Sequence, residues 1–264
     1  MRVFNILKAT ALAAALLAPN VALAADKVKV GVSGGDGEII WQEVKKVAAR
    51  DGIDVQVIVF NDYLLPNAAL DAGDLDLNAF QHKPFLENQV KTKGYKITAI
   101  ADTVVSPIGL YSKKVKALAE LKDSAQVGIP NDPSNGGRGL LLLAQHGLIK
   151  LKEGVGILPR VIDVTDNPKK LKFREIDAAQ LARSLDDLDA AVINTNYALQ
   201  ANLKPGRDSI AIETTKDNPY GNVIAAREKD KDNPLYRRVV KAYQDEAIRS
   251  FIKTRFDGAL LPVW

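Results

Sequence analysis

Short stretches of alternating polar and apolar residues recur along the chain, and most are followed by a stretch with helical spacing. Residues 27–32 alternate strictly, and the apolar residues of 38–50 then recur every three or four positions. This change of period repeats through the rest of the sequence. Strands that alternate with helices indicate an α/β fold with parallel-rich sheets.

The pattern also places the individual elements. It predicts strands at 27–32, 54–60, 125–130, 161–164, 171–176, 188–194, 210–214 and 222–227. It predicts helices at 38–50, within 61–72, from Pro84 to about Gly94, and at 139–146, 177–184 and 196–202, with a long amphipathic helix over 233–254. The segment 104–111 is expected to be extended, with a break at Pro107.

These strands are too many for one small sheet, and no Pro/Gly/Ser-rich linker divides the chain. We therefore expect two lobes joined by extended crossings near 104–111 and 221–227. The first lobe would comprise 25–108 together with 226–264, and the second would comprise 109–225. The C-terminal helix would then return to the first lobe.

The first 24 residues have the pattern of a cleaved secretory signal. Arg2 and Lys8 form a basic start, 9–18 is apolar, and a small-x-small site ends at Ala24. No later segment approaches the roughly 20 apolar residues of a membrane span. The expected location is therefore the periplasm, where a secreted protein without an anchor is retained.

Composition narrows the function further. The chain contains no cysteine, so thiolate catalysis, disulfides and a lipidated N-terminal cysteine are not expected. Its formal net charge is +4, and the leader accounts for two of those charges. This balance does not favour a nucleic-acid partner. With two histidines and neither a GxSxG nor an HExxH motif, we expect no metal, no cofactor, no catalytic residues and no enzymatic activity.

Polar side chains gather in four loops at predicted strand ends, where ligands of open α/β sheets collect. The four are 60–63, 78–85, 131–138 and the pair 193–197 with 218–222. The segment 78–85 combines a histidine, two rings and two amides, which suits a pocket with apolar walls. The alternative is a strand-to-helix turn that packs its phenylalanines into the core. A loop position for His82 favours exposure in a cleft.

The 131–138 segment has the features of an anion site. Ser134 or Asn135 is expected to cap the following helix, which places Arg138 in the first turn. A cation in the first turn is unfavourable, because the positive end of the helix dipole lies there. A guanidinium at this position can, however, bind a carboxylate with two parallel hydrogen bonds, beside the free backbone N–H groups of the helix start. The alternative is a surface arginine paired with a nearby acid.

Several of these stretches match a known family. The chain resembles the methionine-binding proteins of bacterial ABC importers, which include the NlpA-type lipoproteins. The resemblance spans about 27–264, and we identify it on eight motifs: 60–63 (FNDY), 65–67 (LPN), 78–84 (NAFQHKP), 129–133 (IPNDP), Arg138, 147–152 (GLIKLK), 191–195 (AVINT) and Asn222. It implies a two-lobed periplasmic-binding-protein fold with a ligand cleft between the lobes.

The resemblance also implies roles for particular residues. Arg138 would bind the α-carboxylate of an amino acid, and Asn194 and Asn222 would hold the carboxylate and the α-amine. A wall around the ligand side chain would comprise Tyr63, Phe80, His82 and Phe85. The chain departs from this family in lacking the lipid-attached cysteine, in having phenylalanine at 85, and in small residues at 106 and 136–137, which suggest a roomier pocket.

The function expected from these observations is capture of an amino acid, with L-methionine as the expected ligand, and its delivery to an inner-membrane ABC permease with its ATPase. We expect a freely diffusing monomer without a lipid anchor. Two alternatives stay open within that role, namely another amino acid or a short peptide as ligand. Two further alternatives lie outside a transport role. The protein could be an enzyme with the same fold, or an envelope protein that has the fold without binding a solute.

Overall fold

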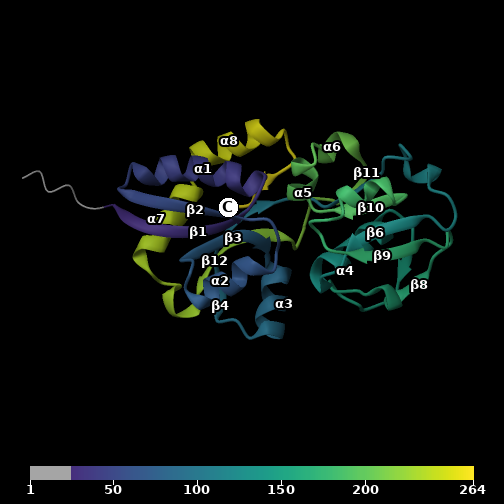
Figure 1. Ribbon diagram of the computed structural model, residues 1–264, viewed down its shortest axis with the longest axis horizontal. Coiled ribbons are helices and arrows are strands. Elements are labelled where there is room, and N and C mark those ends of the chain that lie inside the picture. Colours follow the sequence, from purple (N-terminus) through teal and green to yellow (C-terminus); the bar gives the residue numbers. More distant parts are fainter. Residues whose placement is uncertain (1–24) are drawn as a thin grey trace, which may run out of the picture.

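The computed structural model describes residues 25–264, so the predicted signal segment 1–24 lies outside the described residues. Two sheets lie side by side, each with its own helices (Figure 1). The two-lobed α/β architecture expected from the sequence is confirmed. None of the helices within 25–264 is long and apolar enough to cross a membrane.

The first sheet has the order β13-β4-β12-β3-β1-β2. Its strands are β1 (Asp26–Ser33), β2 (Ile53–Phe60), β3 (Leu77–His82), β4 (Ile97–Val105), β12 (Gly221–Arg227) and β13 (Leu261–Pro262). β1 pairs parallel with β2 and β3, whereas β12 runs antiparallel between β3 and β4. The carboxyl ends of β1, β2 and β3 therefore meet at one edge, which faces the second sheet (Figure 1).

The helices of this lobe are α1 (Asp36–Ala49), α2 (Leu65–Ala72), α3 (Lys83–Lys93), α7 (Pro234–Tyr243) and α8 (Glu246–Phe256). α1 buries Ile40, Trp41, Val44 and Ala48, the helical spacing read from the sequence. α7 and α8 pack on α1 (Figure 1), and the Trp41 ring lies 5.3 Å from that of Tyr243. This contact holds the C-terminal helices against α1.

The second sheet has the order β11-β5-β10-β6-β9. Its strands are β5 (Gly109–Tyr111), β6 (Gln126–Pro130), β9 (Lys172–Ile176), β10 (Ala190–Ile193) and β11 (Ser209–Ile212). Around it lie α4 (Pro133–Gln145), α5 (Thr195–Gln200), α6 (Pro205–Asp208) and the two-stranded β7 (Lys150–Leu151) and β8 (Val164–Asp166). Short 3-10 helices occur at Leu118–Glu120, Val161–Asp163, Arg183–Asp186 and Glu228–Asp230.

Two connections join the sheets, namely 106–108 between β4 and β5, and 213–220 between β11 and β12. All of β12 pairs with β3 and β4. Residues 221–225 therefore lie in the first sheet and not, as expected, in the second lobe. The alternating pattern of 222–227 predicts a strand but does not show which strands it pairs with. The second connection between the lobes was therefore expected near 221–227, whereas it lies at 213–220.

Two predicted helices differ from the structure. The segment 233–254 is two helices, because Asp245 starts α8 by accepting a hydrogen bond from the Ala247 N–H. The segment 177–184 forms turns that lead into the 3-10 helix at Arg183–Asp186. There the Asp177 side chain accepts from the Ala179 N–H and folds the chain locally. Capping side chains outweigh the apolar period in both places.

Candidate functional site

A cavity lies between the edges of the two sheets, and all seven residues predicted for the site line it. The lining comprises Ser33, Asp36, Tyr63, Phe80, Gln81, His82, Phe85, Ser106, Asn135, Arg138, Asn194, Thr195, Asn196 and Asn222. Residues from both lobes contribute to it. The binding roles of the seven remain a prediction, whereas their convergence on one cavity is a structural finding.

His82 ends β3 and starts α3, so the segment 78–85 is a strand and a helix start and not the loop expected from the sequence. Its Nδ1 accepts the N–H of Phe85 at 3.1 Å, which makes His82 the N-cap of α3. Pro84 then lies in the first turn, where a missing N–H costs nothing. The His82 side chain is buried, which corrects the expectation of exposure. The sequence marks 74–77 as strand-like, whereas β3 starts at Leu77, because Asn78 and Gln81 interrupt the apolar pattern of the actual strand.

His82 also connects the two lobes. Since its Nδ1 accepts a hydrogen bond, the neutral ring carries its proton on Nε2 and donates to Asn135 Oδ1 at 3.1 Å. Asn194 Nδ2 donates to the same oxygen at 2.8 Å. Burial, reinforced by the charge of Arg138, lowers the pKa of His82 to about 3. His82 therefore stays neutral at any pH near neutrality and serves as a fixed donor.

The amides of 78–85 are engaged with α2. Asn67 Oδ1 accepts from Asn78 Nδ2 at 2.9 Å and from Gln81 Nε2 at 2.6 Å, and Asn67 Nδ2 donates to Gln81 at 2.7 Å. All three side chains are buried. This network fixes the end of β3, so Asn78 and Gln81 hold the site in place more than they offer free hydrogen bonds.

α4 begins earlier than the sequence suggested. Asp132 is its N-cap and accepts from the Asn135 N–H at 2.9 Å, so neither Ser134 nor Asn135 caps it. Arg138 consequently lies beyond the first turn. Asp, Asn and Ser have similar preferences for the N-cap, so the sequence alone did not decide among Asp132, Ser134 and Asn135.

The small residues at 136–137 serve the packing of α4. A Cβ on Gly136 would lie 2.7 Å from the carbonyl oxygen of Pro130, and one on Gly137 would lie 3.0 Å from the Cα of Leu158. Neither residue lines the cavity. The expectation that they enlarge the pocket is therefore wrong, because they let α4 approach the neighbouring backbone.

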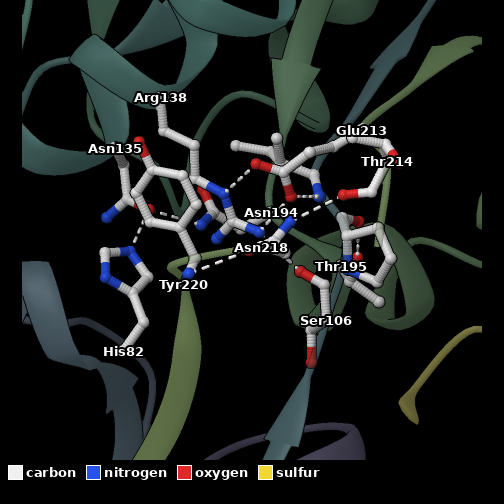
Figure 2. A network of polar contacts seen from close by, with 12 residues as sticks. His82, Ser106, Asn135, Arg138, Asn194, Thr195, Glu213, Thr214, Asn218 and Tyr220 are labelled. Carbon is white, nitrogen blue, oxygen red and sulfur yellow. Dashed lines mark hydrogen bonds and ion pairs between the residues drawn. The ribbon is translucent and has the colours of Figure 1, made fainter. Parts of the chain in front are cut away.

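The Arg138 guanidinium binds the carboxylate of Glu213, a residue that the sequence did not suggest for the site. Its Nε donates to Glu213 Oε1 at 2.9 Å and its Nη2 to Glu213 Oε2 at 2.5 Å (Figure 2). Nη2 also donates to the carbonyl oxygen of Ser106 at 2.9 Å. Arg138 and Glu213 are 3% and 9% exposed, so this is a buried, bidentate ion pair.

This pair also orients the arginine. Ser106 lies in the first connection between the lobes and Glu213 starts the second, so Arg138 contacts both. The Tyr220 ring covers the guanidinium at 4.4 Å (Figure 2). Nη1 makes no hydrogen bond with the described residues and is left for a further partner. Sequence analysis did not identify Glu213 as a site residue, because it falls inside the strand predicted at 210–214. No neighbouring motif indicates that its side chain contacts Arg138.

Aromatic rings form the cavity wall on the first-lobe side. Tyr63 lies 6.0 Å from Phe80 and 5.9 Å from Phe85, and Phe80 and Phe85 are 5.9 Å apart. His82 lies 6.2 Å from Phe85 and 5.1 Å from Tyr220. Edge and tilted contacts of this kind are favourable and stiffen the wall. The rings give this side of the cavity an apolar wall.

Four buried polar atoms of the lining have no hydrogen-bond partner in the protein. They are Asp36 Oδ1, Ser106 Oγ, Asn194 Oδ1 and Asn196 Nδ2. Buried polar groups are nearly always hydrogen-bonded. Their concentration in one cavity indicates that its contents supply the missing partners. Sequence reasoning missed Asp36, which looks like an ordinary acidic residue in the first turn of a helix.

Contacts across the cleft hold the lobes together. Tyr63 Oη donates to Asn196 Oδ1 at 2.5 Å, Tyr197 Oη to the Asn61 carbonyl at 3.3 Å and Gln200 Nε2 to the Gly34 carbonyl at 3.0 Å. Together with the His82–Asn135 bond, these contacts join the two lobes. Within 25–264 no group of three histidine or acidic side chains is placed to hold a metal ion.

The chain is similar to known proteins over nearly its whole length. The model of the family described as NlpA lipoprotein matches residues 28–264. The D-methionine-binding lipoprotein MetQ of Escherichia coli K12 is 50% identical over 240 residues, which cover 90% of this chain and 88% of that protein.

Solved structures agree with this similarity. A nutrient-binding protein from Burkholderia cenocepacia, bound to methionine, is 54% identical with a TM-score of 0.87, over 90% of this chain and 100% of that one. A periplasmic substrate-binding protein of an ABC transporter from Coxiella burnetii is 46% identical with a TM-score of 0.86, over 89% and 100%. The chain therefore belongs to the NlpA lipoprotein family.

Proposed function

We propose that this protein is a periplasmic solute-binding protein that captures methionine and delivers it to an inner-membrane ABC importer, without catalysing a reaction. The observation that carries the proposal is the cavity between the lobes. It combines an oriented, buried arginine with unpartnered polar atoms and a wall of aromatic rings. A zwitterion with an unbranched apolar side chain meets all three features.

The polar end of the cavity suits the α-groups of an amino acid. Arg138 Nη1 would donate to the carboxylate, since Nε and Nη2 are already held by Glu213 and Ser106. Asn194 Oδ1 is free to accept from the α-ammonium, and Asn222 lines the same cavity. The ligand would thus satisfy buried groups that the protein leaves unpaired.

The relatives support the ligand and the partner. They include D-methionine-binding lipoproteins, a protein bound to methionine and a substrate-binding protein of an ABC transporter. The MetQ relatives are D-methionine-binding lipoproteins, whereas the enantiomer expected here is L-methionine. The two enantiomers exchange the positions of ammonium and side chain on the α-carbon, so the orientation of Asn194 and Asn222 decides between them.

We further propose that this protein is not anchored by lipid, although its relatives are lipoproteins. The sequence has no cysteine to carry a thioether-linked lipid, and the leader ends in a plain cleavage site. The protein would then diffuse through the periplasm to its permease.

Capture would proceed by closure of the lobes on the ligand. The hydrogen bonds from Tyr63, His82, Tyr197 and Gln200 all cross the cleft. A ligand that contacts both lobes adds to these bonds only in the closed state and therefore shifts the equilibrium toward it.

Calorimetric titration of unfolded and refolded, ligand-free protein tests the proposal. We expect one-to-one binding of methionine with a Kd between micromolar and nanomolar, or about 8–12 kcal/mol. L- and D-methionine are titrated separately, with alanine and aspartate as controls for a short and for a charged side chain. Absence of binding by any amino acid would contradict the proposal.

A further inference from the structure

A second groove lies on the surface of the first lobe and shares no residue with the cavity between the lobes. Its lining combines three cations, three apolar side chains and one amide, namely Lys231, Arg237, Lys241, Ile100, Val240, Trp264 and Gln244. The apolar side chains are half-buried, whereas the three cations are exposed. The groove therefore has an apolar floor with positive charge along its rim.

The floor of this groove is held in place by hydrogen bonds. Helical spacing puts four lining residues on one face of α7 and its C-cap, namely Arg237, Val240, Lys241 and Gln244. Gln244 Nε2 donates to the Asp102 carbonyl of β4 at 3.0 Å, and Trp264 Nε1 donates to the Gln244 carbonyl at 3.1 Å. These bonds join α7, β4 and the segment after β13, so the groove keeps its shape without an occupant.

The positive charge of the groove is poorly compensated. Lys231 and Lys241 form no ion pair with any residue of 25–264. Arg237 pairs with Asp232 at 2.6 Å, but their side chains are 67% and 71% exposed, so that pair contributes little. Among the described residues, none that lines the groove is acidic. The groove therefore suits an anionic partner that also offers apolar surface.

The groove lies beside the start of β1. Arg238, the neighbour of Arg237 on α7, donates to Asp26 Oδ2 at 3.1 Å, and Asp26 is the first residue of β1. This part of the first lobe lies at the end away from the second sheet (Figure 1). A lipid anchor attached ahead of β1 would hold this same side of the molecule to a membrane. The chain has no cysteine to carry such an anchor, but it presents cations here instead.

We propose that this groove binds an anionic phospholipid surface and keeps the unanchored protein close to the membrane. The heads of Lys231, Arg237 and Lys241 would contact lipid phosphates while their stems cover the apolar floor. Trp264 would lie at the interface between headgroups and acyl chains, where tryptophan is favoured. Each basic residue near an anionic membrane contributes roughly fivefold in affinity, so binding is weak and reversible. The inference rests on the proposed periplasmic location and absence of a lipid anchor, but not on the identity of the ligand.

Sedimentation of the secreted protein with lipid vesicles tests this surface. We expect binding to vesicles of phosphatidylglycerol and phosphatidylethanolamine, a loss of at least about tenfold on vesicles of phosphatidylcholine alone, and release by added NaCl, which screens the charges. Lys231→Gln/Lys241→Gln should weaken binding to the anionic vesicles by about tenfold or more. The matched control is Lys152→Gln/Lys172→Gln, which removes two exposed, unpaired lysines of the second lobe and should keep the binding.

The outcomes separate this inference from the proposed function. Methionine titration and circular dichroism of the Lys231→Gln/Lys241→Gln variant should match the wild type, because the groove lies outside the cavity, so a lost vesicle interaction is not a lost fold. Equal binding to anionic and neutral vesicles, or an equal loss in the control variant, overturns the groove and leaves methionine capture standing. Stronger release by inorganic phosphate than by NaCl of equal ionic strength assigns the groove to a soluble anion and overturns the membrane proposal.

Discussion

Replacement of Arg138 by alanine is expected to weaken methionine binding by about 3–5 kcal/mol, or more than a hundredfold. The α-carboxylate would lose its charged donor inside a closed, buried site, and the remaining asparagines carry no compensating charge. Calorimetric titration of the variant measures the loss. Arg160→Ala is the control, since this arginine lies in the same lobe and its side chain is 76% exposed.

The Arg138→Ala variant also leaves Glu213 buried and unpaired, so weak binding alone could reflect damage to the fold. The double variant Arg138→Gln/Glu213→Gln removes both charges and keeps a hydrogen-bonding side chain at each position; Gln matches Glu in shape and is shorter than Arg. We expect it to fold, as followed by circular dichroism, and still to lose methionine binding. Near-wild-type affinity in either variant would remove Arg138 from the ligand site.

Glu213→Ala is expected to lower the free energy of unfolding by about 3–5 kcal/mol, because it leaves the buried guanidinium without its anion. Of the contacts made by Nε and Nη2, only the hydrogen bond to the Ser106 carbonyl would remain. For a protein of this size the loss corresponds to a fall in Tm of about 6–20 °C. Differential scanning calorimetry of ligand-free protein measures it.

An exposed ion pair provides the comparison for Glu213. Asp186 pairs with Lys113 at 2.6 Å, but their side chains are 71% and 52% exposed. Asp186→Ala should therefore change stability by less than about 1 kcal/mol. If Glu213→Ala is no more destabilising than Asp186→Ala, the buried pair does not organise the site as described.

The sequence predicted local elements well where one signal acted alone. The alternation of 54–60 and the helical spacing of 38–50 agree with β2 and α1. Gly73 and Gly94 end α2 and α3 in the left-handed conformation that favours glycine. Predictions failed where a capping side chain competed with the apolar period, as at Asp177 and Asp245.

The candidate site was likewise predicted in part: residues within local motifs were found, and residues that depend on distant contacts were not. The polar loops and the family resemblance placed Tyr63, Phe80, His82 and Arg138 near one another, and the structure brings them to one cavity. The role of Glu213 could not be predicted from the sequence. Glu213 and Arg138 are 75 positions apart in the chain, and local sequence patterns do not show which distant residues pair. Asp36 was missed because it resembles an ordinary acidic residue in a first helical turn, and no local pattern reveals the contact of α1 with α5 of the second lobe.

A crystal structure of refolded, ligand-free protein after soaking with methionine tests the central claim most directly. The account predicts methionine between the lobes, with a carboxylate oxygen about 3 Å from Arg138 Nη1 and the side chain against Phe80 and Phe85. Methionine bound elsewhere, or a carboxylate held by residues other than Arg138 in an otherwise closed cavity, would contradict it.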